Sequence, residues 1–380
     1  MRNLSELGLT ECSLNRREFF RKTAVAAACA AAAGAVALPA RAEDLTVNGL
    51  PATVFGRTGL KVTKISFGGI LTTEPTVLMR AIDSGINFVH TSPYYTNGRS
   101  IEAFGKVLKT HRQKVVLALK ARPEELERWL KVLNTDYADM LVPPLQSVEE
   151  INDDSIPESF AKAKKAGMCG FMGYACHSDM ANVLNRSREL GWYDVTLMSY
   201  ADANSPAFLQ AAQTAREAGI GIMTMKGLPK RGAEGSTPEE VAQVSSRCTS
   251  MVTTEHAHTV LASMNSFQSV DFYHGILETK LGWASPAAEE SYWAGQQGAY
   301  CSMCDRCSGV CPAGVEVRRI LRYRMYQRDY GLVAYARTKY SLLPQGSCAA
   351  SCTECGLCES VCKRSLPIRR MLSEARVALA

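Results

Sequence analysis

The sequence predicts an α/β protein with two folded parts, a (β/α)8 TIM barrel followed by a small, mainly helical domain. Eight short apolar runs alternate with helix-like spacing between residues 54 and 280, a pattern that favours a closed barrel over an open sheet. Nine of the fourteen cysteines lie in the last 80 residues. At 380 residues, with 46% hydrophobic and 21% charged residues, the chain can form two soluble domains.

Residues 1–42 predict an export signal. The pair Arg16–Arg17 is followed by an uncharged, alanine-rich stretch over residues 24–38 and by the small-x-small sequence Ala-Arg-Ala at 40–42. The stretch is too short and too weakly apolar for a stable membrane span, and an uncleaved amphipathic anchor is the alternative. We expect the twin-arginine translocase to carry the folded protein to the periplasm, with the mature chain beginning near Glu43.

The barrel is predicted over residues 53–285 from its eight strand-like runs. Each run is followed by 10 to 20 residues with the spacing of an amphipathic helix. The charged, glycine-containing stretch 230–240 predicts a loop before the seventh helix. The runs cover residues 61–69, 86–92, 114–121, 139–144, 168–175, 194–200, 219–227 and 258–263.

Two copies of one cysteine spacing occupy the predicted C-terminal domain, residues 290–380. The spacing is C-x2-C-x2-C-x3-C, which bacterial ferredoxins use for 4Fe–4S clusters and in which the fourth cysteine ligates the other cluster. Zinc sites or a disulfide framework are the alternatives, but zinc usually takes separated C-x2-C pairs, and disulfides this close in sequence would be strained. The cross-over rule assigns one cluster to Cys301, Cys304, Cys307 and Cys362, and the other to Cys352, Cys355, Cys358 and Cys311.

The two runs differ in what surrounds them. Pro312 follows the first run, whereas Lys363 follows the second, so we expect the second turn to be displaced toward Pro367. Cys348 has no place in the ligand scheme. We expect it to be a thiol beside the cluster, or an alternative ligand during cluster loading. Cys169, Cys176 and Cys248 lie in the barrel, where free cysteine usually behaves as a small hydrophobe, although Cys176 could serve as a site thiol.

The segment between the runs, residues 317–340, predicts a helix with Ile320, Leu321 and Met325 facing inward. Such a helix is typical of helical two-cluster ferredoxin modules. Its five arginines at 318–328 could offset the negative charge of the clusters or form a docking face for an acidic redox partner protein. The net charge of +6 for the whole chain is modest and does not indicate nucleic-acid binding.

Several stretches resemble the aldo/keto reductase family. Residues 55–69 are similar to its opening strand, and residues 85–108 to its second strand, active-site loop and following helix. Residues 221–228 are similar to the seventh strand of the branch that carries C-terminal ferredoxin domains. The resemblance implies a TIM barrel whose mouth binds a small-molecule substrate, and an oxidoreductase reaction.

In that family a tyrosine gives or takes a proton at the substrate carbonyl. A lysine lowers the pKa of the tyrosine, an aspartate pairs with the lysine and a histidine orients the substrate. The resemblance places Tyr95 and Lys120 at the first two positions. It places His90 at the aspartate position, and Pro143 or Pro144 at the histidine position.

These departures change what the site is expected to do. Lys120 lacks a carboxylate partner, so burial should favour its neutral form. His90 could act as an acid or a base, because the unperturbed pKa of histidine lies near neutrality. His177 follows the fifth strand and is also expected at the barrel mouth. The alternatives are that Tyr95 and Lys120 are remnants, that His90 is packed in a degenerate site and that His177 makes a polar loop contact. The places of Tyr95 and Lys120 at C-terminal strand ends nevertheless indicate a site.

Nicotinamide binding has less support in the sequence. The family grips the dinucleotide phosphate with basic residues after the eighth strand, but residues 263–275 contain no Lys or Arg. Ser263 replaces a glycine where backbone amides would meet phosphate, and Lys226 is one lysine that could touch it. The periplasm also has no nicotinamide pool, so NADP would have to be carried through and kept bound.

Three functions follow from these observations. The first is an exported iron–sulfur oxidoreductase that passes electrons between its clusters and a small molecule at the barrel mouth. The second is an NADP-dependent aldo/keto reductase with retained cofactor. The third is a non-catalytic electron-transfer subunit in which the barrel is a scaffold and the mouth is filled by side chains.

Overall fold

The computed structural model describes residues 45–200, 205–228, 237–253, 256–278, 301, 303–304 and 306–380. The predicted signal and cleavage site lie outside the described residues. Glu43–Ala380 forms one compact unit, so the barrel and the cysteine-rich segment are described together. Within the described residues, no helix combines the length and the apolar character that crossing a bilayer requires.

An antiparallel sheet of three short strands precedes the barrel. It consists of β1 (Thr46–Val47), β2 (Leu50–Val54) and β3 (Lys61–Thr63). Asn48 and Gly49 turn between β1 and β2 with φ of 53° and 82°, as a two-residue hairpin turn requires. Phe55 follows β2, is fully buried, and packs against side chains inside the barrel. The single strand predicted over 61–69 is therefore wrong, because Lys64 separates a hairpin strand from a barrel strand.

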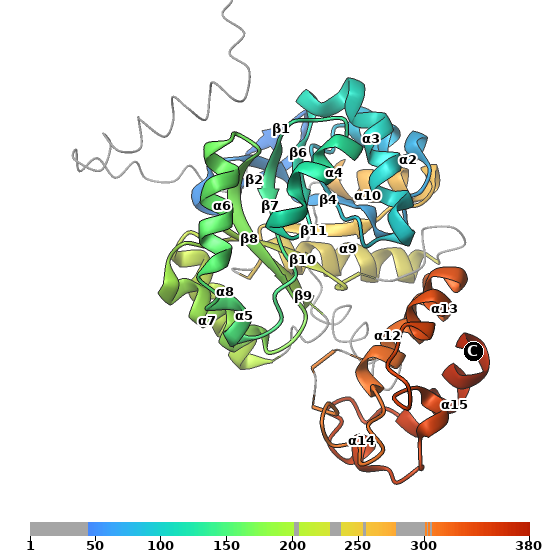
Figure 1. Cartoon of the computed structure of the whole chain (residues 1–380). Helices are drawn as coiled ribbons and strands as arrows, with labels where there is room; N and C mark the ends of the chain where they lie inside the picture. The colour runs from blue at the N-terminus through green and yellow to red at the C-terminus, as the bar shows by residue number, and fades with distance from the viewer. Residues whose placement is uncertain are drawn as a thin grey trace, which may run out of the picture. The chain divides into compact units, whose positions relative to one another are not determined.

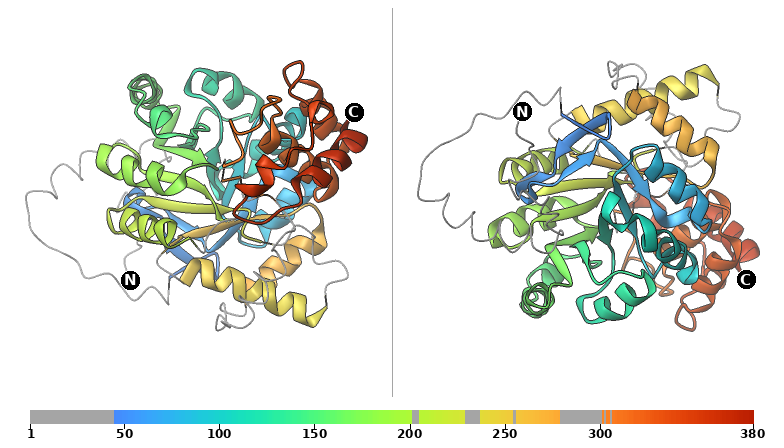
Figure 2. Two further views of the ribbon diagram at one scale, coloured as in Figure 1. Left: turned by 90° about the horizontal axis from the view of Figure 1, so that it is seen from below. Right: turned by 90° about the horizontal axis from the view of Figure 1, so that it is seen from above.

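Eight parallel strands close into the barrel that the sequence predicts (Figures 1 and 2). The last strand pairs with the first, with Val260 opposite Ile65 and Ala262 opposite Phe67. Every strand overlaps one of the eight predicted runs, which confirms the fold class. The strands are β4 (Ile65–Gly68), β5 (Phe88–Thr91), β6 (Val116–Leu119), β7 (Ala138–Leu141), β8 (Cys169–Cys176), β9 (Val195–Ser199), β10 (Gly221–Met225) and β11 (Thr259–Ser263).

Helices surround the strands, and their apolar faces form the main core with the outer face of the barrel (Figure 2). A second, smaller core fills the barrel interior. Helix α9 begins at Pro238, so the predicted loop over 230–240 is too long at its C-terminal end. The helices are α2 (Pro75–Asp83), α3 (Arg99–His111), α4 (Leu126–Val132), α5 (Val148–Ile151), α6 (Ser155–Lys165), α7 (Met180–Leu190), α8 (Pro206–Glu217), α9 (Pro238–Thr253) and α10 (Phe267–Glu278).

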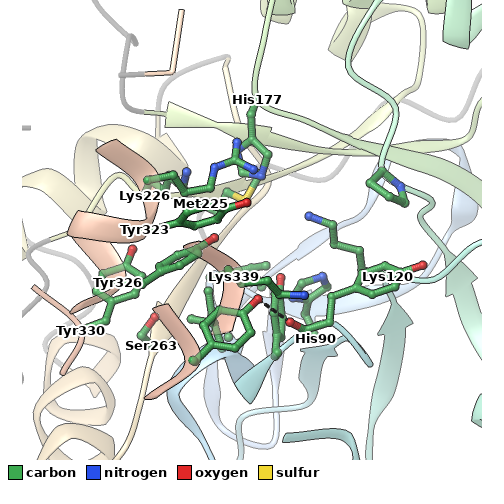
Figure 3. Close-up of a pocket in the computed structure, with 18 residues that line it drawn as sticks. His90, Lys120, His177, Met225, Lys226, Ser263, Tyr323, Tyr326, Tyr330 and Lys339 are labelled. Carbon is green, nitrogen blue, oxygen red and sulfur yellow. Dashed lines mark hydrogen bonds between the residues drawn. The ribbon is translucent and has the colours of Figure 1, made fainter. Parts of the chain in front are cut away.

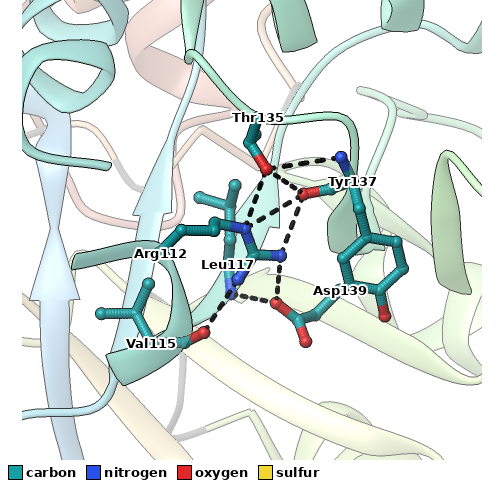
Figure 4. Close-up of polar contacts among 6 residues, drawn as sticks. All are labelled: Arg112, Val115, Leu117, Thr135, Tyr137 and Asp139. Atoms are coloured by element: carbon teal, nitrogen blue, oxygen red, sulfur yellow. Dashed lines mark hydrogen bonds and ion pairs between the residues drawn. The ribbon is translucent and has the colours of Figure 1, made fainter. Parts of the chain in front are cut away.

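A buried ion pair joins the start of β6 to the start of β7, at the N-terminal end of the barrel (Figure 4). Arg112 donates to the carboxylate of Asp139 at 2.8 Å, to the carbonyl of Tyr137 at 2.9 Å and to that of Val115 at 3.0 Å. The same carboxylate oxygen accepts the amide N–H of Leu117 at 2.8 Å. The pair is therefore satisfied by backbone groups on both sides, as a buried charge requires.

The C-terminal segment is mainly helical, as predicted. It contains α12 (Val317–Arg328), α13 (Val333–Ser341), α14 (Leu357–Ser360) and α15 (Ile368–Leu379). The single helix predicted over 317–340 is wrong, because Gly331 adopts φ of 66° and separates α12 from α13. The predicted inward residues Ile320, Leu321 and Met325 are 0%, 2% and 4% exposed. Ile320 and Leu321 pack in a core of their own with α15 and several of the cysteines.

The two cysteine runs have matching backbones. In each run, the second residue after the first cysteine is left-handed, Met303 with φ of 67° and Glu354 with φ of 56°. In each run, the third residue after the last cysteine is also left-handed, Gly314 with φ of 66° and Ser365 with φ of 48°. Left-handed backbone is costly for residues other than glycine and gathers at sites that clamp ligands. The matching positions therefore show that the sequence repeat is also a structural repeat.

The turn after the second run is not displaced toward Pro367, so that expectation was wrong. In both runs the amide three residues after the last cysteine donates to the carbonyl of that cysteine, at 3.1 Å in each case. In both runs the next long helix begins six residues after the last cysteine, at Val317 and at Ile368. Lys363 thus takes the place of Pro312 without shifting the turn.

Candidate functional site

A cavity of about 320 Å³ opens at the C-terminal ends of the barrel strands. Twelve of its eighteen lining residues come from the barrel and six from the C-terminal segment. The barrel residues follow or end different strands, among them His90 on β5, Lys120 after β6 and Ser263 on β11. This is the face on which TIM-barrel enzymes build their active sites.

His90 and Lys120 lie together on the barrel wall of the cavity (Figure 3). His90 is 2% exposed and Lys120 is 8% exposed. The Lys120 amide donates to the Thr91 carbonyl at 2.9 Å, and the Ser92 hydroxyl donates to the Lys120 carbonyl at 2.7 Å. These bonds hold the backbone on which Lys120 extends its amino group into the cavity.

Burial sets the charge of both groups. It lowers the pKa of His90 to about 3, with the Lys120 ammonium as the second cause. The expectation that His90 titrates near neutrality is therefore wrong, and the imidazole is neutral at pH 7. Burial lowers the pKa of Lys120 to about 8, and the Arg322 guanidinium adds to this effect. The lowered pKa agrees with the expectation for a lysine that has lost its carboxylate partner.

Tyr95 lines the cavity beside His90, with 5.8 Å between the two ring centroids. Burial raises the pKa of Tyr95 well above its usual value, and the phenols of Tyr326, Tyr335 and Tyr330 raise it further. The family resemblance implied a tyrosine whose pKa is lowered by the lysine. The structure shows the opposite direction, so Tyr95 keeps its proton at neutral pH.

His177 and Pro144 also line the cavity. The His177 amide donates to the side-chain oxygen of Gln146 at 3.0 Å, and the side-chain nitrogen of Gln146 donates to the Ala175 carbonyl at 3.0 Å. Gln146 thus ties the loop after β7 to the end of β8. Burial lowers the pKa of His177 well below its usual value, and the cations of Lys226, Lys120, Arg322 and Arg318 lower it further.

The two residues considered for nicotinamide binding, Lys226 and Ser263, line the cavity as well. Lys226 follows β10 and has a φ of 61°. This left-handed backbone conformation costs energy for a residue other than glycine. After β11, the amides of Asn265 and Ser266 both donate to the Ser269 hydroxyl at 3.1 Å. The chain's own hydroxyl therefore satisfies the amides at the start of α10, where a phosphate would otherwise bind.

The six residues from the C-terminal segment were not found by sequence reasoning. Tyr323, Tyr326 and Tyr330 are spaced three and four residues apart, which places them on one side of α12 and its end. That tyrosine spacing was the available signal. The full set on this wall is Arg322, Tyr323, Tyr326, Tyr330, Tyr335 and Lys339.

Two hydrogen bonds join this wall to the barrel. The Tyr335 hydroxyl donates to the Tyr94 carbonyl at 2.6 Å, and Arg318 donates to the Ser178 hydroxyl. Tyr94 in turn donates its own hydroxyl to Glu125 at 2.5 Å. Because Tyr94 precedes Tyr95, this bond links α13 to the loop that carries Tyr95, the residue expected to be the catalytic acid.

The eight cysteines of the two runs fall into three classes of exposure. Cys307 and Cys358 are buried, Cys355 is exposed, and the others are half-buried. Burial raises the pKa of Cys301, and Cys304 and Cys362 act on it as neighbouring sulfurs while the Lys226 ammonium opposes them. Within the described ranges, no three His, Cys, Asp or Glu side chains converge as a metal-binding group. The Cys362 sulfur of the second run is among the groups that raise the pKa of Cys301 in the first run, and the cross-over assignment stays a prediction.

The remaining cysteines have no site role in the structure. Cys169, Cys176 and Cys248 are 2% exposed or less, and burial raises the pKa of each to about 12. The Cys176 thiol donates to the Ser178 carbonyl at 2.9 Å, so it is a hydrogen-bonded thiol and not a reactive thiolate. Cys348 lies beside the Tyr340 hydroxyl.

Comparison with known proteins agrees with this geometry. Residues 72–174, from the end of β4 to β8, match the model of the aldo/keto reductase family. Over these residues the barrel is similar to the aldo/keto reductase family. A protein of Pseudomonas aeruginosa classed as an aldo-keto reductase is 19% identical, with a TM-score of 0.51 over 63% of this chain and 96% of that one. The holo form of the aldo-keto reductase AKR11C1 from Bacillus halodurans is 20% identical, with a TM-score of 0.51 over 62% and 97%. At this identity the two structures show the fold alone.

A curated relative is similar in sequence. The uncharacterized oxidoreductase YqkF of Bacillus subtilis is 27% identical over 142 residues, which are 31% of this chain and 46% of the relative. The chain thus spans about half the length of that relative. The match to the family model lies within the barrel, and α12 and α13 lie outside that match.

Proposed function

We propose that this chain is an exported oxidoreductase of the aldo/keto reductase type, with two 4Fe–4S clusters that exchange electrons with a small molecule in the barrel cavity. The observation that carries the proposal is the composition of the cavity wall. Six of the residues that line the cavity come from the segment between the two cysteine runs, and Lys226 on the barrel side is a charge that lowers the pKa of Cys301. The predicted cluster ligands therefore flank the segment that lines the cavity.

The cysteine-rich segment fits such clusters on three observations. The two runs share their left-handed positions, Cys362 lies near Cys301, and the Met303 amide donates to the Cys301 sulfur at 3.4 Å. Amide donors to sulfur are among the contacts that set cluster potentials. Bound clusters supply single-electron transfer. The ligands would be the two sets of four assigned above, with Cys348 in neither.

The barrel residues would donate protons to the substrate and stabilise its developing negative charge. Tyr95 keeps its proton at neutral pH, so it can donate to a substrate oxygen that gains negative charge during reduction. Lys120, with a pKa of about 8, is mostly charged at pH 7 and would stabilise the same oxygen electrostatically. His90 and His177 are neutral and can accept or donate one hydrogen bond each. The helices of the C-terminal segment would limit the access of water.

The two alternatives fit less well. A dinucleotide would need free amides or basic residues after β11, but the amides of Asn265 and Ser266 bond to Ser269 and residues 263–275 contain no Lys or Arg. A pure scaffold would have its mouth filled by side chains, whereas the cavity measures about 320 Å³, within the size range of small-molecule sites. Denaturing the purified protein and finding bound NADP would revive the nicotinamide alternative.

Iron and acid-labile sulfide analysis of anaerobically purified protein tests the proposal. We expect about eight irons per chain, since each of two cubanes holds four. Cys301→Ser should lose roughly half of the iron, because one cluster loses a ligand, whereas Cys348→Ser should keep all of it. Fewer than four irons in the wild-type protein, or equal losses in both variants, would contradict the ligand assignment.

Export is tested separately by sequencing the N-terminus of periplasmic protein. The proposal expects a start near Glu43, and replacing Arg16–Arg17 with a Lys–Lys pair should leave the protein in the cytoplasm. Periplasmic protein that begins at Met1 would contradict a cleaved signal.

A further inference from the structure

The charges around the cavity have one sign. Four basic side chains line it, Lys120, Lys226, Arg322 and Lys339, and none of its eighteen lining residues is Asp or Glu. Low-dielectric walls strengthen the repulsion between such groups. Burying Lys120 and Arg322 with no carboxylate among the described lining residues is costly, so the lining favours a ligand that brings negative charge.

Three buried nitrogen atoms on the same lining have no hydrogen-bond partner among the described residues. They are Nε2 of His90, Nδ1 of His177 and Nε of Arg322. His90 and His177 are 2% and 7% exposed. Buried polar atoms are normally paired, and three orphans around one cavity indicate a ligand with several oxygen or nitrogen atoms. Arg322 presents a planar fork, which suits a carboxylate or another flat oxyanion.

The other dominant lining group is aromatic. Six tyrosines face the cavity, two from the barrel and four from the C-terminal wall. Tyr326 stands 5.8 Å from Tyr330 and 5.5 Å from Tyr335 between ring centroids, with tilted planes. Figure 3 shows Tyr323, Tyr326 and Tyr330 on the side that faces the Lys120 amino group. Tyrosine faces favour flat rings, and tyrosine hydroxyls add donors at their edge.

Charge compensation for the clusters does not account for this lining. Lys226 lowers the pKa of one predicted cluster ligand, Cys301. Lys120 and Arg322 both lower the pKa of His177, and Arg322 also lowers the pKa of Lys120. The Lys339 amino group lies 5.5 Å from the centroid of the Tyr335 ring, and Arg318, also on α12, bonds to Ser178. Lys120, Arg322 and Lys339 therefore lie beside groups of the cavity itself.

We propose that the cavity binds a planar aromatic anion, with its carboxylate or equivalent oxyanion between Lys120 and Arg322 and its ring against the tyrosines of α12 and α13. This inference rests on the site of the proposed function and names the class of molecule it takes. The barrel alone supplies only half of this site, because Arg322 and four of the tyrosines come from the C-terminal segment.

Calorimetric titration of the anaerobic holoprotein with three small probes tests the charge and the ring separately. The probes are 2-naphthoate, which is flat and anionic, 2-naphthalenemethanol, which is flat and neutral, and cyclohexanecarboxylate, which is anionic and not flat. We expect 2-naphthoate to bind at least about tenfold more tightly than either of the others, since charged hydrogen bonds are the strong ones.

Variants on two sides of one helix sharpen the test. Arg322→Gln should weaken 2-naphthoate binding about tenfold, whereas Arg319→Gln, at a half-exposed position beside Glu316, should leave it unchanged. Tyr326→Leu should weaken 2-naphthoate but not cyclohexanecarboxylate. Iron content and circular dichroism are measured for each variant, and if Arg322→Gln does not fold, Tyr326→Leu and the probe series still decide.

Three results would overturn the proposal. They are equal binding of the neutral alcohol, equal effects of Arg322→Gln and Arg319→Gln, or no binding of 2-naphthoate up to about 10 mM. The readout is equilibrium binding and needs no turnover. Failure here therefore leaves the redox proposal standing, and a protein that binds 2-naphthoate but holds no iron would fail the proposed function alone.

Discussion

The two ends of the barrel differ in whether their buried positive charges are paired with a carboxylate. At the N-terminal end, Arg112 is paired with the fully buried Asp139 and with backbone carbonyls. At the C-terminal end, Lys120 and Arg322 face a cavity in whose lining the described part of the chain places no acidic residue. The barrel thus pairs a buried cation with a carboxylate at its N-terminal end. At the cavity, its cations are available to bind a ligand.

The contrast separates a residue that stabilises the protein from residues held for function. A buried charge that is paired and hydrogen-bonded lowers the stability of the fold little. Removing one partner leaves the other charge buried without compensation, which is strongly destabilising. Cations without a carboxylate keep an unfavourable energy in the free protein, and a bound anion can relieve it. Each of the following predictions changes one side of this comparison.

The largest effect is expected at the paired end. Arg112→Met should lower the free energy of unfolding by about 3–5 kcal/mol, because it leaves the Asp139 carboxylate buried without its cation. Arg80→Met is the matched control, since Arg80 and Asp271 form an ion pair that is about half exposed and worth at most about 1 kcal/mol. Urea denaturation measures both. Similar losses in the two variants would show that the buried pair is not a structural anchor.

A large loss of turnover is expected from Tyr95→Phe at the open end. Phenylglyoxylate, an aromatic keto acid, with two equivalents of reduced methyl viologen and two protons would give mandelate, and the variant lacks the proton donor. We expect the rate to fall by about 10²-fold or more, with 2-naphthoate affinity within about twofold of wild type. Tyr174→Phe, which loses only a core hydrogen bond to Ser187, is the control. An unchanged rate in Tyr95→Phe would exclude the phenol as the acid.

A smaller effect is expected from pH. The pKa of Lys120 is lowered to about 8, so its charge is present below pH 8 and is lost as the pH rises through that value. An anion binds the charged form, and 2-naphthoate affinity should therefore fall by roughly tenfold between pH 7 and 9.5. Arg322, His90, His177 and Cys176 face Lys120. Burial lowers the pKa of His90 and of His177 and raises that of Cys176 to about 12, so none of these three groups titrates in this range.

The variant Lys120→Met removes the titrating group. It should bind 2-naphthoate weakly and with no pH dependence over that interval, as measured by calorimetry in buffers of matched ionic strength. A wild-type profile that rises with pH, or a variant that keeps the wild-type profile, would assign the titration to another group.

The smallest effect is expected at Cys176. Its thiol is fully buried, its pKa is raised to about 12, and it donates to the Ser178 carbonyl. Iodoacetamide should not label it in the folded protein, as peptide mass spectrometry can show, and Cys176→Ala should leave 2-naphthoate affinity unchanged. Rapid labelling would restore the hypothesis of a site thiol.

Sequence reasoning found the features that depend on local pattern. The eight strands follow from short apolar runs, and Tyr95, Lys120, His90 and His177 follow from positions near the ends of those strands. The pKa of His90 could not be predicted, because it depends on complete burial beside the Lys120 ammonium. The turn after Cys362 also could not, since it forms without the proline that marks the first copy.

The second wall of the cavity was missed for a different reason. Arg322, Tyr326 and Lys339 are close to Lys120 and Tyr95 only because α12 and α13 lie against the barrel mouth through bonds such as Tyr335 to Tyr94. Nothing in the spacing of α12 identifies its partner surface. In sequence, the arginines of this helix therefore suggested a partner-docking face or cluster compensation, whereas the structure turns Arg322 toward the cavity.

The central claim is that the cavity and the first cysteine run form one redox site, joined at Lys226. Electron paramagnetic resonance of the dithionite-reduced holoprotein, with and without saturating 2-naphthoate, tests it most directly. The account predicts that the ligand changes the signal of one reduced cluster and that Arg322→Gln, at the same ligand concentration, reduces the change. Identical spectra with and without ligand, at a concentration shown by calorimetry to saturate the cavity, would contradict it.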